Sequence, residues 1–275
     1  MNVDLHCHST ASDGLLGPRE LVARAAANGV EVLSLTDHDD TSGLAEARAE
    51  AQSRGLRFID GVEVSVSWRG TTVHVVGLQI DAESEILRGG LEAIRQGRAT
   101  RAERIAESLA AAGVPDTLAG ARRHAENPEL ISRAHFARYL VEAGHAEDVK
   151  TVFQRYLVKD RPGHVAHRWA SLADAVSWIR ASGGLAVVAH PGRYKLSKAE
   201  MRELLGEFKE HGGAGIEVVT GSHAPEQYFE FARSAREFGL LASRGSDYHG
   251  KGESRADLGR LPSLPDDLKP VWHDW

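Results

Sequence analysis

Two histidines near the N-terminus, His6 and His8, stand two residues apart in a stretch with the alternation of a β-strand. Val3 and Leu5 are apolar and alternate with polar residues, so both imidazoles are expected on one face of the strand. Two imidazoles directed at one point are typical of a metal site, because a bound ion compensates for bringing them together. Asp13 follows on a turn that can return a carboxylate to the same place. A polar strand end without function is the alternative interpretation.

Later segments show a similar pattern, in which a histidine or a carboxylate lies within an apolar run or directly follows one. Strands are predicted over residues 30–35, 58–68, 71–80, 185–189, 216–219 and 240–243. The polar residues that accompany them include His38, Glu63, His74, His190, Asp247 and His249. Helices between strands imply parallel neighbours with right-handed crossovers, whose carboxyl ends meet at one mouth of the fold. We therefore expect these side chains to converge.

A hairpin is predicted for the two valine-rich runs, with its turn at residues 69–70. This turn places Ser65 opposite His74, so Glu63 becomes a diagonal neighbour of His74 on the same face. The two side chains can then share an ion. An exposed strand carboxylate and a half-buried histidine are the alternatives.

The convergent set contains six imidazoles and three carboxylates, more than one tetrahedral site requires. A mixture of nitrogen and oxygen ligands suits Mn, Fe or Zn, and the count fits two or three neighbouring ions. Such a cluster lowers the pKa of a bridging water and neutralises a phosphoryl group during in-line displacement.

The periodicity predicts one α/β domain with a helical insert. Helices are expected over residues 18–28, 86–112, 171–181 and 225–238, and no convincing strand appears between residues 79 and 164. We therefore predict a barrel formed by residues 1–97 and 166–275, with a helical insert at 98–165 that caps the substrate. The insert carries eleven Lys/Arg and nine Asp/Glu, whereas the remainder carries 22 and 30. This difference favours an anionic ligand between the two parts, and an ordinary solvated helical surface is the alternative.

The overall composition excludes several classes of protein. With a formal charge of −6, nothing in the overall composition indicates a nucleic-acid polyelectrolyte partner, and no apolar run of membrane-spanning length occurs. Cys7 is the single cysteine, so a cytoplasmic location is expected. Because Cys7 lies between two predicted ligands on a strand, its side chain should point away from them.

The motifs resemble, in the same order, those of the polymerase and histidinol phosphatase (PHP) superfamily. They are His6-x-His8 with Ser12-Asp13-Gly14, Thr36-Asp37-His38-Asp39, Gly61-Val62-Glu63, His190-Pro191 and Asp247-x-His249. The resemblance implies a distorted TIM-like (β/α)7 barrel with three divalent transition-metal ions, Mn2+ in first place and Fe2+ or Zn2+ as alternatives. It assigns His6, His8, Glu63 and Asp247 to one ion, Asp13, His38 and His249 to a second, and Glu63, His74 and His190 to a third. Glu63 would bridge two ions.

Within that superfamily the chain most resembles the stand-alone 3′,5′-nucleotide bisphosphate phosphatases, whose relatives are also 5′-to-3′ exoribonucleases on short RNA. This implies hydrolysis of the 3′-phosphate of a nucleoside 3′,5′-bisphosphate by a metal-bridging hydroxide. Alternatives are exoribonuclease activity and a metal-binding module without turnover. A small nucleotide or short RNA is the expected partner, with no membrane and no obligate protein partner.

Candidate contacts for the rest of the substrate are basic residues of the insert and of the barrel rim. They are Arg101, Arg133, His135 and Arg193. Arginine suits phosphate because its planar fork donates two hydrogen bonds at once. We expect Arg133, His135 and Arg193 to clamp the phosphate that does not react. The alternative is that Arg101 and Arg133 pair with glutamates on helix surfaces.

Overall fold

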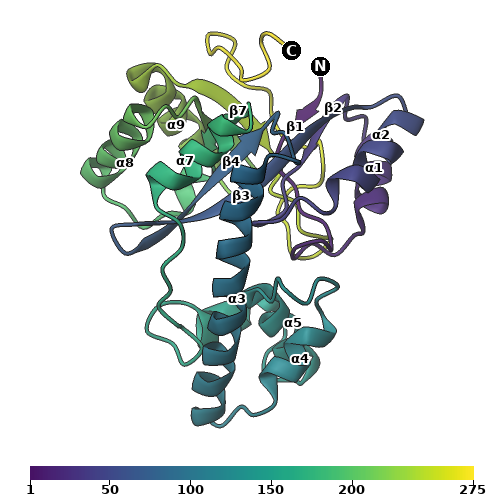
Figure 1. The fold of residues 1–275 in the computed structure, drawn as a ribbon, viewed down its shortest axis with the longest axis vertical. Coiled ribbons are helices and arrows are strands. Elements are labelled where there is room, and N and C mark those ends of the chain that lie inside the picture. The colour runs from purple at the N-terminus through teal and green to yellow at the C-terminus, as the bar shows by residue number, and fades with distance from the viewer.

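The computed structural model describes residues 1–275, and its centre is a seven-stranded sheet that curls into a nearly closed barrel (Figure 1). The strands follow one another in chain order, so each pairs with its sequence neighbour. They are β1 (Val3–Asp4), β2 (Val32–Leu35), β3 (Arg57–Trp68), β4 (Thr71–Leu78), β5 (Leu185–Val188), β6 (Gly215–Thr220) and β7 (Leu241–Gly245).

The predicted hairpin and its register are confirmed, because Ser65 pairs with His74 and Trp68 pairs with Thr71. The expectation of parallel neighbours is only partly right. Strand β4 is antiparallel both to β3 and to β5, whereas the other neighbouring pairs are parallel. A two-residue turn reverses the chain before β4. The long excursion after β4 returns the chain at the end of the sheet where β4 finishes, because Leu185 at the start of β5 pairs with Leu78 at the end of β4.

Hydrogen bonds from the segment after β1 to β7, and to the segment after β7, draw the two ends of the sheet together. The Leu5 N–H donates to the Arg244 carbonyl at 3.0 Å, and the His8 N–H donates to the Tyr248 carbonyl at 2.9 Å. The two chain termini consequently lie near each other, at the end of the molecule away from α4 and α5 (Figure 1).

Helices cover the outside of the barrel, with α1 and α2 on one side and α7, α8 and α9 on the other (Figure 1). Their bounds are α1 (Pro18–Ala27), α2 (Leu44–Ser53), α7 (Leu172–Ala181), α8 (Lys198–Glu210) and α9 (Pro225–Phe238). A short 3-10 helix, η2, covers Pro191–Arg193. No helix in the structure combines the length and the hydrophobicity needed to cross a membrane.

The long helix α3 runs out of the barrel and into a separate helical lobe (Figure 1). The elements of this region are α3 (Glu85–Ala111), α4 (Thr117–Arg123), α5 (Arg133–Glu142), α6 (Val149–Val152) and the π-helical turn η1 (Phe153–Leu157). The lobe has its own apolar core of twelve buried residues, which includes Ile105, Phe136 and Leu157. Because α3 is continuous across residue 98, the predicted start of the insert lies inside a helix.

A buried ion pair ties α3 to the barrel. The Arg98 Nε donates to the Asp39 Oδ2 at 2.8 Å, and the Ser65 backbone N–H donates to the Asp39 Oδ1 at 2.7 Å. Asp39 has a φ of 53°, a left-handed conformation that aspartate tolerates better than most residues. The pair therefore connects the loop after β2, the strand β3 and the helix α3.

Replacing Arg98 should destabilise the protein strongly, because the buried Asp39 carboxylate would lose its only cation. We expect Arg98→Met to lower the free energy of unfolding by about 3–5 kcal/mol, measured by chemical denaturation. The double variant Arg98→Met/Asp39→Asn should recover part of the loss. Arg88→Met is the matched control, since Arg88 pairs with Glu83 on the exposed surface. Equal effects at the two positions would contradict the assigned role.

Candidate metal centre

All nine predicted ligands meet at the mouth of the barrel. Their metal-binding atoms form four overlapping groups, and within each group these atoms lie within 4.8 Å of one another. The groups are His8/Asp13/His38/His249, His6/His190/Asp247, His6/His8/Glu63 and His38/Glu63/His74. Members such as His6, His8 and Glu63 belong to more than one group. The nine side chains therefore form one continuous cluster, because the four groups share residues.

Glu63 lies at the centre of this cluster and is fully buried. Its Oε1 is 2.8 Å from the His190 Nε2 and 2.9 Å from the His74 Nδ1, and its Oε2 is 2.9 Å from the His38 Nδ1. The strand register explains this position, because Glu63 on β3 is the diagonal neighbour of His74 on β4. One carboxylate thus contacts imidazoles from three segments.

His6 and His8 project to the same side of their segment, as their spacing predicts. Their Nε2 atoms are 3.1 Å apart, and each is 3.4 Å from an oxygen of Glu63. The Asp247 Oδ1 is 3.7 Å from the His6 Nε2 and 3.4 Å from the His8 Nε2. Ligands about 2.1 Å from a tetrahedral ion are about 3.4 Å from one another. The separations in this set fit a shared ion.

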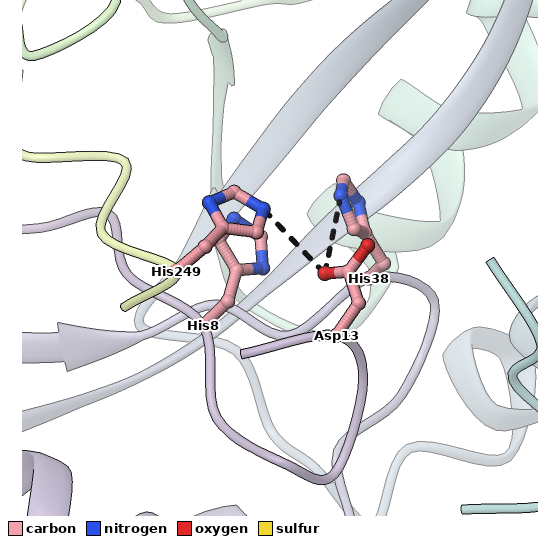
Figure 2. A group of neighbouring side chains, drawn as sticks. All are labelled: His8, Asp13, His38 and His249. Carbon is pink, nitrogen blue, oxygen red and sulfur yellow. Dashed lines mark ion pairs between the residues drawn. The ribbon is translucent and has the colours of Figure 1, made fainter. Parts of the chain in front are cut away.

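Asp13 reaches the cluster from the loop after His8, as Figure 2 shows. Its Oδ1 is 3.5 Å from the His249 Nε2 and 3.9 Å from the His38 Nε2. Buried Asp37 holds this loop by accepting hydrogen bonds from the Ser9 N–H at 2.7 Å and the Ser12 hydroxyl at 2.5 Å. Gly14 is required there, because a Cβ would lie 2.2 Å from the His8 carbonyl oxygen.

Several donor atoms in the cluster are buried and have no hydrogen-bond partner. They include His8 Nδ1, His190 Nδ1, Asp13 Oδ1 and Asp247 Oδ1. Burying polar atoms without partners is unfavourable, and a divalent cation would supply the missing interaction for the carboxylate oxygens in particular. Nitrogen and oxygen donors of this kind suit transition-metal ions. The residues present therefore fit a metal centre.

The protonation states of Glu63 and His8 also favour metal binding. Burial raises the pKa of Glu63, but the imidazoles of His74, His38 and His6 outweigh this and hold it well below its ordinary value. Burial, together with His249 and His38, lowers the pKa of His8 to about 3. A neutral imidazole and an ionised carboxylate are the forms that bind metals.

Burial opposes protonation of His6, yet Glu217, Glu63 and Asp247 outweigh it and raise the pKa of His6 well above its ordinary value. Similarly, Glu63 and Asp13 overcome burial and raise the pKa of His38 to about 9. These two imidazoles hold protons that a metal ion would displace.

Glu217 on β6 is a site residue that the sequence analysis missed. Its carboxylate is buried, accepts from the His6 Nδ1 at 2.7 Å, and accepts from the His190 backbone N–H at 2.5 Å. His190 has an unusual φ of 26°, so this second bond stabilises a strained backbone. A carboxylate bonded to the rear nitrogen of a metal-binding imidazole fixes its tautomer. The sequence does offer one indication of this role, because Glu217 is an acidic residue inside an otherwise apolar strand.

Cys7 faces away from the cluster, as predicted. Its Sγ lies 3.1 Å from the Ser34 carbonyl oxygen in the main apolar core. Burial, with the neighbouring carboxylates, raises the pKa of the Cys7 thiol well above its ordinary value. The thiol is therefore protonated at neutral pH and is a poor metal ligand.

The four predicted substrate contacts have different environments. The Arg193 Nη1 is 3.0 Å from the Asp247 Oδ2, at the edge of the metal cluster. His135 is buried and its Nδ1 accepts from the Ser132 N–H at 3.0 Å. The Arg133 Nη1 is 3.3 Å from the Leu157 carbonyl oxygen. Neither Arg101 nor Arg133 forms an ion pair with a glutamate, so the alternative that they pair on helix surfaces is wrong.

Replacing Glu217 tests its positioning role. In Glu217→Gln, the amide can still accept from His6, but its NH2 group would face the His190 N–H and leave that donor unpaired. We expect apparent metal affinity to fall about 10- to 100-fold, measured by competition with a chelator. Glu210→Gln is the matched control, because Glu210 is exposed at the end of α8. Unchanged affinity in a folded Glu217→Gln protein would reject the role.

Comparison with known proteins agrees with this geometry. Curated relatives include the 3′,5′-nucleoside bisphosphate phosphatase of Chromobacterium violaceum, 50% identical over 99% of this chain and 96% of the relative. The 5′-3′ exoribonuclease Rnm of Escherichia coli is 41% identical over 99% of this chain and 93% of the relative.

Two solved structures share the fold. An amidohydrolase from Chromobacterium violaceum, solved with bound sulfate and no metal, superposes with a TM-score of 0.97 at 50% identity, covering 100% of this chain and 95% of that one. A putative metal-dependent phosphoesterase from Bifidobacterium adolescentis gives a TM-score of 0.85 at 28% identity, covering 98% and 93%. The PHP domain model matches residues 4–221. This chain belongs to the PHP domain family.

Proposed function

We propose that this protein is a metal-dependent phosphatase that hydrolyses the 3′-phosphate of nucleoside 3′,5′-bisphosphates to a nucleoside 5′-phosphate and phosphate. The observation that carries the proposal is the buried cluster of nine nitrogen and oxygen ligands around Glu63. A known protein supports the proposal, because the 3′,5′-nucleoside bisphosphate phosphatase of Chromobacterium violaceum is 50% identical along nearly the whole chain.

Three divalent ions are proposed for the cluster, with Mn2+ first and Fe2+ or Zn2+ as alternatives. His6, His8, Glu63 and Asp247 would hold one, Asp13, His38 and His249 a second, and Glu63, His74 and His190 the third. When bound, the ions neutralise charge on the phosphoryl group and activate water. Glu217 orients His6 for this task, and Asp37 holds the loop that carries Asp13.

The phosphate that does not react requires its own contacts, and we assign them to Arg133, His135 and Arg193. Because Ser132 donates to the His135 Nδ1, the proton of the neutral ring resides on Nε2, where it can be donated to an anion. Burial is the main cause that lowers the pKa of His135 to about 4, so this donor form persists at neutral pH. Arg193 and Arg133 supply the charge.

A second candidate function is 5′-to-3′ exoribonuclease activity on short RNA, since the relative at 41% identity is an exoribonuclease. The same cluster could cleave a phosphodiester. Release of inorganic phosphate from a nucleoside bisphosphate, compared with release of a nucleotide from a short oligonucleotide, separates the two activities. A module without turnover is disfavoured, because the ligand set is complete. A cytoplasmic location and the absence of an obligate protein partner stay predictions.

Metal content provides the first test of this proposal. Purified protein should contain more than one transition-metal ion per chain, and chelation should abolish phosphatase activity. Glu63→Ala should reduce metal content more than any other single ligand replacement, because Glu63 contacts imidazoles from several segments. Elemental analysis is the measurement, with Glu210→Ala as the control. Full activity with no more than one ion per chain would overturn the multinuclear assignment.

Arg133 provides the second test. Arg133→Ala should lower kcat/KM for a nucleoside 3′,5′-bisphosphate by about ten- to a hundred-fold, the value of a charged hydrogen bond. It should barely change hydrolysis of a small phosphate monoester that has no second phosphate. Arg122→Ala is the matched control, because Arg122 is exposed on α4. Equal losses on both substrates would place Arg133 at the reacting centre or in the scaffold.

A further inference from the structure

Arg138 on the lobe helix α5 bonds to two loops at the mouth of the barrel. Its Nε and Nη2 donate to the two carboxylate oxygens of Glu253, each at 2.8 Å, and its Nη2 also donates to the Asp13 backbone carbonyl at 2.6 Å. The arginine is only 8% exposed. A two-pronged bond between arginine and carboxylate has a defined geometry, so these three bonds, the Arg138 clamp, hold the two loops in one relative position.

Both clamped loops carry predicted metal ligands. Asp13 belongs to the first loop, and Glu253 lies in the turn that begins at His249. The Ser254 hydroxyl in this turn accepts from the His249 N–H at 2.7 Å, and the His249 carbonyl accepts from the Leu15 N–H of the first loop at 2.7 Å. The Asp13 Oδ1 and the His249 Nε2, 3.5 Å apart, therefore come from loops that a residue of the lobe joins.

His38, the remaining ligand assigned to the second ion, is also held by the helix that enters the lobe. The residue after it, Asp39, accepts from the Arg98 Nε through its side chain at 2.8 Å and from the Arg95 Nη1 through its carbonyl at 2.9 Å. Both arginines lie on α3. All three ligand segments of this ion are thus bonded to arginines of α3 or α5.

Ligands assigned to the other two ions have partners inside the barrel. Glu217 of β6 bonds to the His6 Nδ1 at 2.7 Å, and the Tyr194 hydroxyl accepts from the His74 N–H at 2.8 Å. Glu63 and His74 lie on paired strands, whose ladder fixes them. Asp13 and His249 lie on loops, which are more mobile than strands and need a separate support.

We propose that Arg138 is a positioning residue for the ion assigned to Asp13, His38 and His249. This proposal rests on the three-ion assignment of the proposed function. Metal ligands must be held within about 0.5 Å of their productive positions, and the clamp provides this precision for Asp13 and His249. The ligands of the other two ions do not require it, because Arg138 contacts none of the residues that hold them.

The position of Arg138 on α5 also connects this ion to the substrate. His135, which we assign to the phosphate that does not react, lies three residues before Arg138, and both side chains are buried. Residues three apart share a face of a helix. One face of α5 therefore carries a contact for the substrate and the clamp for a metal loop, so the lobe has a role in metal binding besides covering the substrate.

Metal retention tests the proposal without turnover. Arg138→Met keeps an unbranched side chain and removes all three bonds of the clamp. We expect the apparent affinity for one Mn2+ to fall about 10- to 100-fold, so that the variant retains one ion fewer per chain in competition with a chelator. Elemental analysis after the competition is the measurement. Arg123→Met is the matched control, because Arg123 pairs with Glu142 on the exposed surface of the same lobe.

Double variants separate a positioning role from a general loss of structure. Asp13→Ala removes a ligand of the second ion and keeps the backbone carbonyl, so adding Arg138→Met should leave its metal content unchanged. His74→Ala removes a ligand of the third ion, and adding Arg138→Met should there remove a further ion. A further loss of the same size in both backgrounds would overturn the proposal.

Glu253→Gln is the second variant, for use if Arg138→Met does not fold. It weakens the clamp from the other loop and should lower the affinity for the same ion, with Glu210→Gln as the control. A folded clamp variant that retains every ion with wild-type affinity would overturn the positioning role.

Failure of the positioning role and failure of the phosphatase function give different results. Wild-type protein that releases no phosphate from a nucleoside 3′,5′-bisphosphate would reject the phosphatase function, and the metal comparison would still be valid. Wild-type metal content in Asp13→Ala would instead reject the positioning role, even in an active phosphatase.

Discussion

The contact between Glu63 and the imidazoles around it is the interaction on which the rest of the site depends. A fully buried carboxylate is stable only when charge or hydrogen bonds compensate for its lost solvation. Here His38, His74 and His190 approach it within 2.9 Å. These histidines follow β2, belong to β4 and follow β5. The barrel can therefore bring its ligands together only if the β3–β4 hairpin keeps its register, because a shift of one residue would turn Glu63 to the opposite face.

Residues beside the ligands hold the segments that carry them. Cys7 packs into the core between His6 and His8, Asp37 holds the loop of Asp13, and Asp39 pairs with Arg98. In each short segment, neighbouring side chains thus divide into those that face the metals and those that fix the backbone. The same division continues into the helical lobe, where Arg98 is neutralised by Asp39 and Arg101 is not.

Local patterns predicted a large part of this structure. The register of the hairpin followed from its two-residue turn, and this register brings Glu63 to His74. The convergence of most other ligands followed from their positions after strand ends. Features that depend on distant partners were not predictable. Glu217 on β6 matters because it contacts His6, which follows β1, and His190, which follows β5. The pairing of β4 with β5 likewise joins strands that are separated by a long stretch of chain. For Arg101 and Arg133, the sequence identified cations, but only the folded chain shows that no carboxylate neutralises them.

The closure of the barrel by residues at opposite ends of the chain has a consequence for the time at which the protein acquires its metals. Asp247 and His249 are made about 240 residues after His6 and His8. At about 5–20 residues per second, roughly 12–50 s separate these events. Until then the nascent chain presents the two imidazoles and the Cys7 thiol without the carboxylate that completes their site. The complete ligand set therefore exists only after both the N-terminal histidines and the Asp247-x-His249 segment have been made and have met in the folded barrel.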